Sequence, residues 1–370
     1  MQWLTDIKNT REALWQNTGY PFVSPNFLLP LQNTGCIGGD SGWQPHYLTN
    51  HLSPEQQRWV IPAFVKTHSY GEYVFDWSWA EAYQKHGLEY YPKLLIAAPF
   101  TPATGPRHSG LTQDEFAACL PEIEQHCQEQ GLSSAHYLFA NATDQTVLDA
   151  SPWHRRTSVQ FHWFNREYRH FDDFLSDFKS RKRKAVLKER NSLRDQGIRI
   201  TQQPARDVDE ALWHFFYLCY QNTYAKRGMQ GYLTLDAFKQ LAQRFPHDMV
   251  LMTAYGPHQQ PVACALFFKD DTTLYGRYWG CTHEIPGLHF ELCYYQGIEY
   301  CIEHGLSQFN PGTQGEHKIS RGFEPVECFS YHWLAHEGFS EAVARFVKEE
   351  AIHMTQYRNQ CRTLLPFKHD

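Results

Sequence analysis

Residues 289–304 read His289-Phe-Glu-Leu-Cys-Tyr-Tyr-Gln-Gly-Ile-Glu-Tyr-Cys-Ile-Glu-His304, and this stretch decides the fold because its apolar residues follow a single period. Phe290, Cys293, Tyr294, Gly297, Ile298, Cys301 and Ile302 recur at helical spacing, which places them in one stripe of an amphipathic helix. Gly305, directly after His304, is a typical end signal. The pattern predicts a helix with one buried face.

The segments around this helix predict a strand on each side and a polar loop after the second strand. Thr273-Leu-Tyr-Gly-Arg-Tyr-Trp-Gly280 has the aromatic content and alternation of a strand, and Gln308-Phe-Asn310 is a second, short strand. The loop that follows is Pro311-Gly-Thr-Gln-Gly-Glu-His-Lys-Ile-Ser-Arg-Gly-Phe323. Glycines flank its polar residues and allow close approach of backbone to a ligand, so we expect a functional loop. A solvated surface loop is the alternative.

This order of elements resembles the closing half of a GNAT-type acyltransferase domain and, more narrowly, the FemAB-like family of N-acyltransferases. The match extends over nearly the whole chain. It is carried by Leu288–Tyr295, Gln314–Phe323, His68–Trp79, Pro99–Arg107 and Ser180–Lys184. The resemblance implies an α/β (α+β) fold of two GNAT-like acyltransferase domains. It also implies transfer of an acyl or aminoacyl group to an amine acceptor, with a cell-wall precursor as one candidate acceptor.

The length of 370 residues favours two domains. We expect an N-terminal GNAT-like domain over residues 1–165 and a C-terminal GNAT-like acyltransferase domain over residues 166–370. In the first, strands are predicted at Trp59–Lys66, Lys93–Phe100 and Ser134–Ala140, and a capping box opens a helix at Thr112. In the second, helices are predicted at Asp172–Gly197, Val208–Arg227 and Leu235–Phe245, and strands at Met249–Tyr255, Val262–Lys269 and Thr273–Gly280.

Composition indicates a globular cytoplasmic protein. The net charge is −6, which disfavours nucleic-acid binding over the whole surface but permits a local basic patch. No run reaches 18 apolar residues, and the N-terminus does not have the pattern of a secretory signal. The ten scattered cysteines form no C-x-x-C pair and are expected to be reduced core thiols. The oligomeric state does not follow from the sequence.

The run Lys179-Ser-Arg-Lys-Arg-Lys-Ala-Val-Leu-Lys-Glu-Arg190 contains seven basic residues in an acidic protein. Arginine binds phosphate through two hydrogen bonds and lysine through a point charge. We therefore expect Arg181, Arg183 and Lys184 to bind a phosphate-bearing substrate, and the same field suits an RNA backbone or the phosphates of coenzyme A. A solvated cationic helix face and a protein-docking surface are the alternatives.

The stretch His68–Trp79 mixes acids and aromatic residues. Aromatic walls around an acid raise its pKa toward the range useful for proton transfer, so Asp76 is a catalytic candidate. An aromatic packing cluster with a hydrogen-bonded aspartate is the alternative. The residues expected to bind substrate in this cleft are His68, Tyr70, Tyr73, Trp77, Lys93 and Arg107.

Acyl transfer to an amine requires proton removal, stabilisation of an oxyanion and orientation of two substrates. The family resemblance places a functional lysine at Lys318. His317 and Glu291 are candidate bases, although an acid in the first turn of a helix also favours the helix dipole. Further candidates for substrate binding are Tyr275, Tyr278, Gln314 and Arg321. Tyr275 and Tyr278 are expected on opposite faces of their strand.

Several familiar patterns are absent from the sequence. Cys281-Thr-His-Glu-Ile-Pro-Gly-Leu288 stands where the GNAT pyrophosphate loop is expected, which disfavours ordinary acetyl-CoA binding. There is no H-E-x-x-H, G-x-S-x-G, P-loop or dinucleotide motif. We expect no metal and no permanently bound cofactor, with acyl-CoA or aminoacyl-tRNA as co-substrate. Charged tRNA is therefore a candidate partner. A non-catalytic recognition protein for a peptidoglycan precursor or another phosphate-bearing ligand is the alternative function.

Overall fold

The computed structural model describes residues 1–15, 19–313 and 315–368. The chain divides into two compact units: unit 1 comprises Met1–Val159 and Glu327–Gln356, and unit 2 comprises Gln160–Val326 and Tyr357–Asp370. A single cut near residue 165 does not produce this division, because strand β14 (Glu324–Leu334) returns and pairs antiparallel with β7 (Ser134–Tyr137). Strands β8 (His154–Phe164) and β14 and helix α11 (Glu337–Thr363) each have residues in both units.

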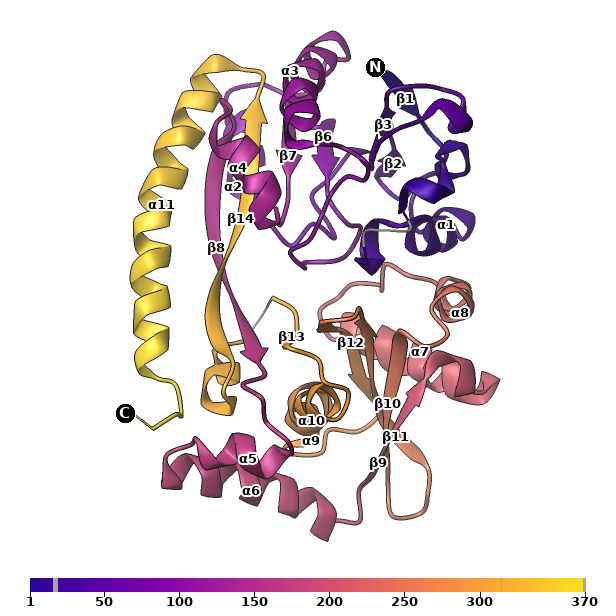
Figure 1. The fold of residues 1–370 in the computed structure, drawn as a ribbon, viewed down its shortest axis with the longest axis vertical. Helices are drawn as coiled ribbons and strands as arrows, with labels where there is room; N and C mark the ends of the chain where they lie inside the picture. Colours follow the sequence, from indigo (N-terminus) through magenta and orange to yellow (C-terminus); the bar gives the residue numbers. More distant parts are fainter. Residues whose placement is uncertain (16–18, 314, 369–370) are drawn as a thin grey trace. The chain divides into compact units, whose positions relative to one another are not determined.

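Unit 1 contains a mixed sheet with helices packed on it (Figure 1). Its strands follow the order β2-β5-β6-β7-β14-β8, and a separate small sheet has the order β1-β3-β4. The helices are α1 (Pro25–Asn33), α2 (Trp77–Lys85), α3 (Gln113–Glu129) and α4 (Ala142–Asp149). The remaining strands are β1 (Gln2–Leu4), β2 (Trp43–Pro45), β3 (Tyr47–Thr49), β4 (Val60–Ile61), β5 (Phe64–Lys66) and β6 (Lys93–Ile96).

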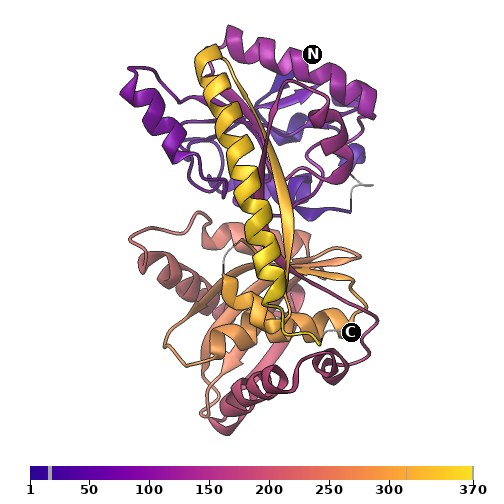
Figure 2. The same ribbon diagram turned by 90° about the vertical axis from the view of Figure 1, so that its left-hand side faces the viewer.

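Helix α3 covers one face of this sheet because its apolar stripe is continuous. Phe116, Ile123 and Cys127 are buried against strand residues such as Leu94 and Tyr137. The predicted capping box at Thr112 is confirmed. A second core joins α2, the end of β14 and α11, which runs alongside β14 in both views (Figures 1 and 2). The predicted single strand Trp59–Lys66 is wrong: it divides into β4 and β5.

Unit 2 contains a sheet with the order β8-β13-β12-β11-β10-β9. Its strands are β9 (Arg199–Pro204), β10 (Met249–Tyr255), β11 (Pro261–Lys269), β12 (Thr273–Cys281) and β13 (Gln308–Asn310). Its helices are α5 (Phe171–Ser176), α6 (Ser180–Asp195), α7 (Glu210–Ala225), α8 (Leu235–Arg244), α9 (Leu288–Phe290) and α10 (Gln296–Glu303). A π-helical turn, η6 (Glu291–Tyr295), joins α9 to α10, and a 3₁₀ segment, η7 (Glu316–Arg321), lies in the predicted polar loop.

Two features of unit 2 differ from the sequence-based expectation. The predicted helix Asp172–Gly197 is interrupted at Asp177–Lys179, where Phe178 bridges to Phe367 and the Lys179 N–H donates to the Pro366 carbonyl, 2.9 Å away. The predicted helix 289–304 contains the π-turn. Single π-turns within helices occur frequently at functional sites, so this segment is a candidate for part of the functional site.

The expectation that Tyr275 and Tyr278 lie on opposite faces of β12 is also wrong. The register shifts in the β11–β12 ladder: Phe268 pairs with Tyr275 and Leu266 pairs with Tyr278. This β-bulge adds one residue to β12 and reverses the alternation. Both tyrosines therefore share one face, on which the Tyr278 ring packs 5.1 Å from Tyr220 of α7.

None of the helices in the described residues is long and apolar enough to span a bilayer.

The close approach of α7 to β12 predicts the effect of one substitution. A Cβ at Gly280 would lie 1.9 Å from the Cys219 carbonyl oxygen, and this backbone atom cannot move without shifting α7. We expect Gly280→Ala to lower the free energy of unfolding by about 1–3 kcal/mol, measured by urea denaturation. Gly338→Ala is the control, since its Cβ would meet nothing closer than 3.4 Å. Equal urea midpoints for the two variants would contradict this.

Candidate functional site

The predicted site residues form two groups, one in each unit. Unit 1 contains His68, Tyr70, Tyr73, Asp76, Trp77, Lys93 and Arg107. Unit 2 contains Arg181, Arg183, Lys184, Tyr275, Tyr278, Glu291, His317, Lys318 and Arg321. Gln314 lies outside the described residues. The two groups are considered separately below.

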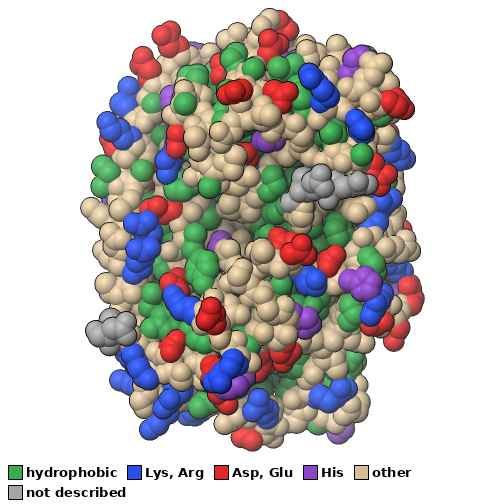
Figure 3. Space-filling model, viewed as in Figure 1, with side chains coloured by type: hydrophobic (Ala, Val, Ile, Leu, Met, Phe, Trp, Pro, Cys, Tyr) green, Lys and Arg blue, Asp and Glu red, His purple; other side chains and the backbone are tan. Residues whose placement is uncertain are grey.

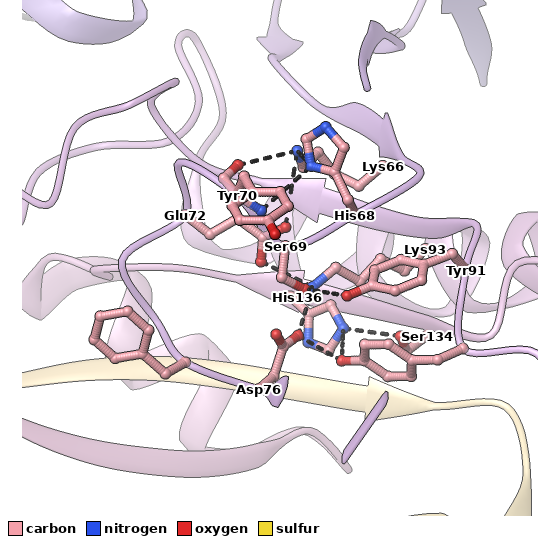
Figure 4. A network of polar contacts seen from close by, with 12 residues as sticks. Lys66, His68, Ser69, Tyr70, Glu72, Asp76, Tyr91, Lys93, Ser134 and His136 are labelled. Atoms are coloured by element: carbon pink, nitrogen blue, oxygen red, sulfur yellow. Dashed lines mark hydrogen bonds and ion pairs between the residues drawn. The ribbon is translucent and has the colours of Figure 1, made fainter. Parts of the chain in front are cut away.

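In unit 1, two lysines face each other at the ends of neighbouring strands. Lys66 on β5 is the register partner of Lys93 on β6, and both side chains are fully buried. Two like charges in this arrangement are costly unless acids neutralise them. The loop after β5 supplies Glu72 and Asp76, which are 4% and 2% exposed. We call Lys66, Glu72, Asp76 and Lys93 the ion cluster (Figure 4).

Lys93 is the centre of the ion cluster. Its Nζ donates to Glu72 Oε2 at 2.8 Å, to Asp76 Oδ2 and to Ser69 Oγ at 2.9 Å. Burial lowers the pKa of Lys93, but Glu72 and Asp76 outweigh this and hold it above its ordinary value. Lys66 has no comparable partner: its Nζ lies 4.0 Å from Glu72 Oε1, and burial lowers its pKa to about 7. Lys93 is therefore a fixed cation, whereas Lys66 is not.

The two carboxyl groups of the ion cluster, like the two lysines, differ in their pKa. Burial raises the pKa of Glu72 to about 7 despite the nearby lysines. Burial also raises the pKa of Asp76, but Lys93 and His136 outweigh it, so that this pKa lies below its usual range. Asp76 also accepts a hydrogen bond of 2.6 Å from the Tyr90 hydroxyl. A group held so firmly as an anion is a weak proton acceptor, and this arrangement favours a structural role for Asp76.

The residues around the ion cluster divide into buried and exposed sets. Tyr70 and Trp77 are 48% and 43% exposed, and their rings lie 5.1 Å apart. Tyr73 is partly buried and adopts a φ of 61°, which is strained for a tyrosine. His68 accepts from the Tyr70 N–H at 3.2 Å. Arg107, by contrast, is fully buried and donates to the backbone carbonyls of Ala103, Gly105, Pro106 and Leu138, as a structural arginine does.

A buried histidine pair extends the network and was not identified from the sequence. His136 on β7 and His332 on β14 are register partners, and their Nδ1 atoms lie 2.6 Å apart. Burial lowers the pKa of His136 to about 3 and that of His332 well below its ordinary value, so both rings are neutral. His136 Nε2 lies 3.2 Å from the Tyr90 hydroxyl, which contacts Asp76. No periodic pattern in the sequence predicts this pairing, because it depends on strand order.

In unit 2, the loop from Gly312 to Phe323, here called the Lys318 loop, turns inward at Lys318. This side chain is 1% exposed, and its Nζ donates to the Gly312 carbonyl at 2.7 Å. Gly312 has a φ of 91°, which only glycine adopts readily. Burial lowers the pKa of Lys318 to about 7, and nearby Cys293 opposes this only in part. No ion pair joins Lys318 to an acid within the described residues. It is therefore an amine that exchanges its proton near neutral pH.

The Lys318 loop faces the π-turn of the preceding helix. The Tyr294 hydroxyl lies 2.8 Å from His317 Nε2, and the Lys318 Nζ lies 5.9 Å from the centre of the Tyr294 ring. His289 stacks edge-on against Tyr294. Burial, together with the charges of Lys318 and Arg321 and the neighbouring His317, lowers the pKa of His289 to about 4. His289 is thus neutral, and it adds hydrogen-bonding capacity without charge.

A cavity of about 100 Å³ lies beside this group. It is bounded by β11, β12, the helix and the start of the Lys318 loop, and its lining includes Gly276, Trp279, His289, Cys293, Tyr294 and Pro311. Of the two tyrosines predicted to bind substrate, Tyr278 is among the lining residues and Tyr275 is not. The lining therefore combines apolar, aromatic and neutral polar groups with one cation, Arg277. The Lys318 amine lies 5.9 Å from the centre of the Tyr294 ring.

Ion pairs with α6 hold the π-turn and the Lys318 loop. Arg321 donates to the His317 carbonyl at 2.7 Å and to Glu189 at 2.9 Å, and Glu189 also accepts from the Tyr295 hydroxyl at 2.6 Å. Arg190 donates to Glu291 through Nε and Nη2 and to Glu299. Both Glu291 oxygens accept hydrogen bonds from Arg190. This arrangement favours a positioning role for Glu291 and Arg321.

The basic segment lies on the exposed part of α6. Arg181 and Lys184 are exposed and Arg183 is partly buried. A hollow of about 500 Å³ opens between α5, α6 and α10, but its lining includes Leu187, Arg190 and Arg194 rather than these three residues. The structure therefore does not bring Arg181, Arg183 or Lys184 together with the Lys318 cavity through any contact among the described residues.

Sequence reasoning missed His289, Cys293 and Tyr294 as members of this site. Cys293 and Tyr294 belong to the apolar stripe and were assigned to the core. The signal that was available is the tyrosine hydroxyl in that stripe, since a buried hydroxyl requires a partner, and the polar loop that follows supplies His317. No cluster of three or more His, Cys, Asp or Glu side chains suited to a metal occurs among the described residues.

Comparisons with known proteins agree with this fold. Residues 4–369 match the model of a family described as peptidoglycan biosynthesis/recognition. The crystal structure of FemX is similar, with 10% identity and a TM-score of 0.55, covering 93% of this chain and 100% of that one. L-PGS from Bacillus licheniformis has 10% identity and a TM-score of 0.53, covering 89% of this chain and 98% of that one.

A conserved protein of unknown function from Bacteroides thetaiotaomicron is similar to the same degree. It has 11% identity and a TM-score of 0.53, and the match covers 90% of this chain and 98% of that one. At such identities, these structures show a shared fold. A search of curated protein sequences found no match.

The ion cluster predicts a large difference between a buried and an exposed lysine. Lys93→Met leaves the carboxylates of Glu72 and Asp76 buried beside Lys66 alone, and we expect it to cost about 3–5 kcal/mol of stability. Lys85→Met removes an exposed pair with Glu81, whose side chains are 69% and 64% exposed, and should leave the stability nearly unchanged because solvent screens the pair. Urea denaturation measures both. A small loss for Lys93→Met would show that the ion cluster does not stabilise unit 1.

Proposed function

Because the chain belongs to the FemAB-like family, whose model spans residues 4–369, we propose that it is an N-acyltransferase with Lys318 at the reacting centre. The enzyme transfers an acyl or aminoacyl group from a donor ester or thioester to an amine acceptor and forms an amide bond. A cell-wall precursor that carries a free amine is the proposed acceptor class, in keeping with the family description of peptidoglycan biosynthesis/recognition.

The observation that supports this proposal is the state of the Lys318 amine. It is buried, it has no acidic partner among the described residues, and burial lowers its pKa to about 7. A general base is most effective when its pKa lies near the working pH. Lys93 shows the contrast within the same chain, since two acids hold its charge and raise its pKa. Burial also lowers the pKa of Lys66 to about 7, but Glu72 lies 4.0 Å from that amine, whereas the Lys318 amine donates to a backbone carbonyl.

The reaction proceeds by addition and elimination at the donor carbonyl. The acceptor nitrogen attacks the carbonyl carbon, a C–N bond forms, and the carbonyl oxygen becomes an oxyanion. Neutral Lys318 takes a proton from the attacking nitrogen, and the resulting ammonium stabilises the oxyanion. The C–O or C–S bond of the donor then breaks, and the proton passes from Lys318 to the leaving oxygen or sulfur. Lys318 returns to its neutral form.

Two neutral residues beside Lys318 support these steps, and Arg277 contributes a positive charge to the cavity lining. Tyr294 and the neutral His289 line the cavity and offer hydrogen bonds for orienting substrates. Arg321 acts through the backbone: it binds the His317 carbonyl and Glu189, and thereby fixes the loop that carries Lys318. The contacts of Arg190 with Glu291 fix the π-turn in the same way. The Lys318 side chain is 1% exposed, and electrostatic interactions of a group removed from water are stronger than in solution.

The donor is tested by binding. Trp279 lines the cavity and its ring lies 5.2 Å from His289, so a donor in the cavity should change its fluorescence. Purified protein is titrated with acyl-CoA of short and long chain and, separately, with charged and uncharged tRNA. Saturable binding of acyl-CoA or of charged tRNA identifies the donor class. Trp279→Phe, which removes the reporter, should abolish the fluorescence change but not the binding measured by calorimetry.

A second candidate function is recognition without catalysis. It is favoured by three exposed aromatic residues, Tyr70 and Phe75 in the loop after β5 and Trp77 at the start of α2. Exposed aromatic residues that gather in one loop are typical of binding surfaces. Tight binding of an amine-bearing cell-wall precursor, with no product from either donor class, would favour this function over acyl transfer.

The proposed role of Lys318 predicts a defined pH dependence. Below pH 7 the amine is protonated and inactive as a base, and above pH 7 it is neutral, so log kcat/KM should rise with pH and level off above about 7. Lys318→Met should lower kcat by about 10²–10⁴-fold. Lys318→Arg keeps the charge but not the base, and should remove the rise near pH 7.

The titration of Lys318 is also measured without any substrate. Competitive labelling of lysines with an amine-selective reagent, followed by mass spectrometry, gives the pKa of each amine. We expect Lys318 to titrate near 7. Lys348→Met serves as the activity control. Full activity of Lys318→Met would exclude Lys318 from the reacting centre.

A further inference from the structure

The outward face of α6 carries charge that the proposed reaction does not use. Arg181, Lys184 and Lys188 are spaced three and four residues apart, so they lie on one face of the helix. All three are exposed, whereas Val186, Arg190 and Leu193 are buried on the opposite side. We call the three exposed basic residues the α6 face. Figure 3 shows Lys and Arg side chains gathered along the lower margin of the molecule, where Figure 1 places α6.

No acid forms an ion pair with the α6 face in the part of the chain that the structure describes. Among the described residues, no ion pair involves Arg181, Lys184 or Lys188, although Arg190 of the same helix pairs with Glu291 and Glu299. The exposed Asp195, at the end of α6, is the only acid on the outward side of this helix. A row of uncompensated cations in a chain of net charge −6 creates a local positive field that attracts polyanions.

The C-terminal segment extends this face. The Lys179 N–H donates to the Pro366 carbonyl at 2.9 Å, the Lys368 N–H donates to the Asp177 carbonyl at 2.8 Å, and the rings of Phe178 and Phe367 lie 5.4 Å apart. These contacts hold residues 364–368 beside the start of α6. Lys368 is exposed there and adds a fourth cation.

Exposed apolar side chains accompany these cations. Leu364 is 61% exposed and Leu187, three residues after Lys184, is 38% exposed. The large exposed aromatic side chains of the described chain lie elsewhere, at Tyr70, Phe75, Trp77 and Phe346. Single-stranded nucleic acid is usually bound by cations together with aromatic platforms. Cations together with exposed leucines are instead the composition of a helix that lies on an anionic bilayer.

We propose that the α6 face, with Leu187, Leu364 and Lys368, docks unit 2 onto a membrane surface of anionic phospholipid, with α6 parallel to the bilayer. Arg181, Lys184 and Lys188 contact lipid phosphates, and the leucines enter the boundary between headgroups and acyl chains. In this proposal Arg181 and Lys184 bind lipid phosphates rather than the phosphate-bearing substrate expected from the sequence. It does not depend on the proposed acyl transfer.

Co-sedimentation with vesicles tests this proposal. The full chain is mixed with vesicles of phosphatidylcholine alone or with about one third phosphatidylglycerol. We expect binding to the mixed vesicles only, and loss of that binding when NaCl is raised from about 50 mM to about 500 mM. Arg181→Glu/Lys184→Glu/Lys188→Glu should weaken binding by about tenfold or more. Leu187→Ser/Leu364→Ser should weaken it by less, without changing its dependence on salt.

A charge-matched variant distinguishes an effect of the α6 face from an effect of the net charge. Lys8→Glu/Arg58→Glu/Lys348→Glu reverses three exposed basic residues of unit 1 and gives the same net charge, and it should bind the mixed vesicles as the parent chain does. Arg181→Gln/Lys184→Gln/Lys188→Gln covers the case in which the Glu variant does not fold. Equal weakening by both triple Glu variants would overturn the proposal, as would a parent chain that ignores phosphatidylglycerol. Binding to duplex RNA but not to vesicles would overturn it in favour of a nucleic-acid surface.

Discussion

The parallel pairing of β12 with β13 is the constraint on which the Lys318 site depends. It comprises only three register pairs, from Thr273–Gln308 to Tyr275–Asn310. Parallel neighbours require a crossover, and α9, the π-turn and α10 supply it. Beyond the last pair, Gly276 meets Pro311, where a Cβ would lie 3.2 Å from the Pro311 Cα. The β12–β13 ladder ends at this point, and the chain leaves the sheet as the Lys318 loop. The cavity lies where the pairing of the two strands ends.

Three buried lysines show how the same side chain acquires different properties. Lys93 is held by Glu72 and Asp76 and keeps its charge, so it stabilises the loop of the ion cluster. Lys66, its register partner, lacks so close an acid, and burial lowers its pKa. Lys318 has a backbone carbonyl as its hydrogen-bond partner. The difference arises from the distance to a carboxylate, because each amine is almost completely removed from water.

The sequence identified much of this arrangement where the pattern was strong. The stripe from Phe290 to Ile302 predicted the crossover helix, and the glycine-flanked run after Pro311 predicted the polar segment that carries Lys318. Prediction from the sequence failed where a local irregularity interrupted the regular spacing of residues along a strand or helix. A bulge in β12 placed Tyr275 and Tyr278 on one face, and the predicted helix 172–197 is divided where Lys179 contacts Pro366. Neither irregularity leaves a mark in hydrophobic periodicity, since each depends on a partner that is distant in the chain.

By itself, the sequence determined the class of fold, the family, the crossover helix and the identity of the loop that carries Lys318. These follow from local period, glycine positions and long motifs, which are properties of neighbouring residues. Only the tertiary structure decided which polar groups meet. It paired His136 with His332, joined Glu291 to Arg190 through hydrogen bonds and buried Lys318. Each arrangement involves residues from separate elements. The charge on each of these groups depends on its distance to other groups and to water, and those distances are set by packing rather than by local sequence.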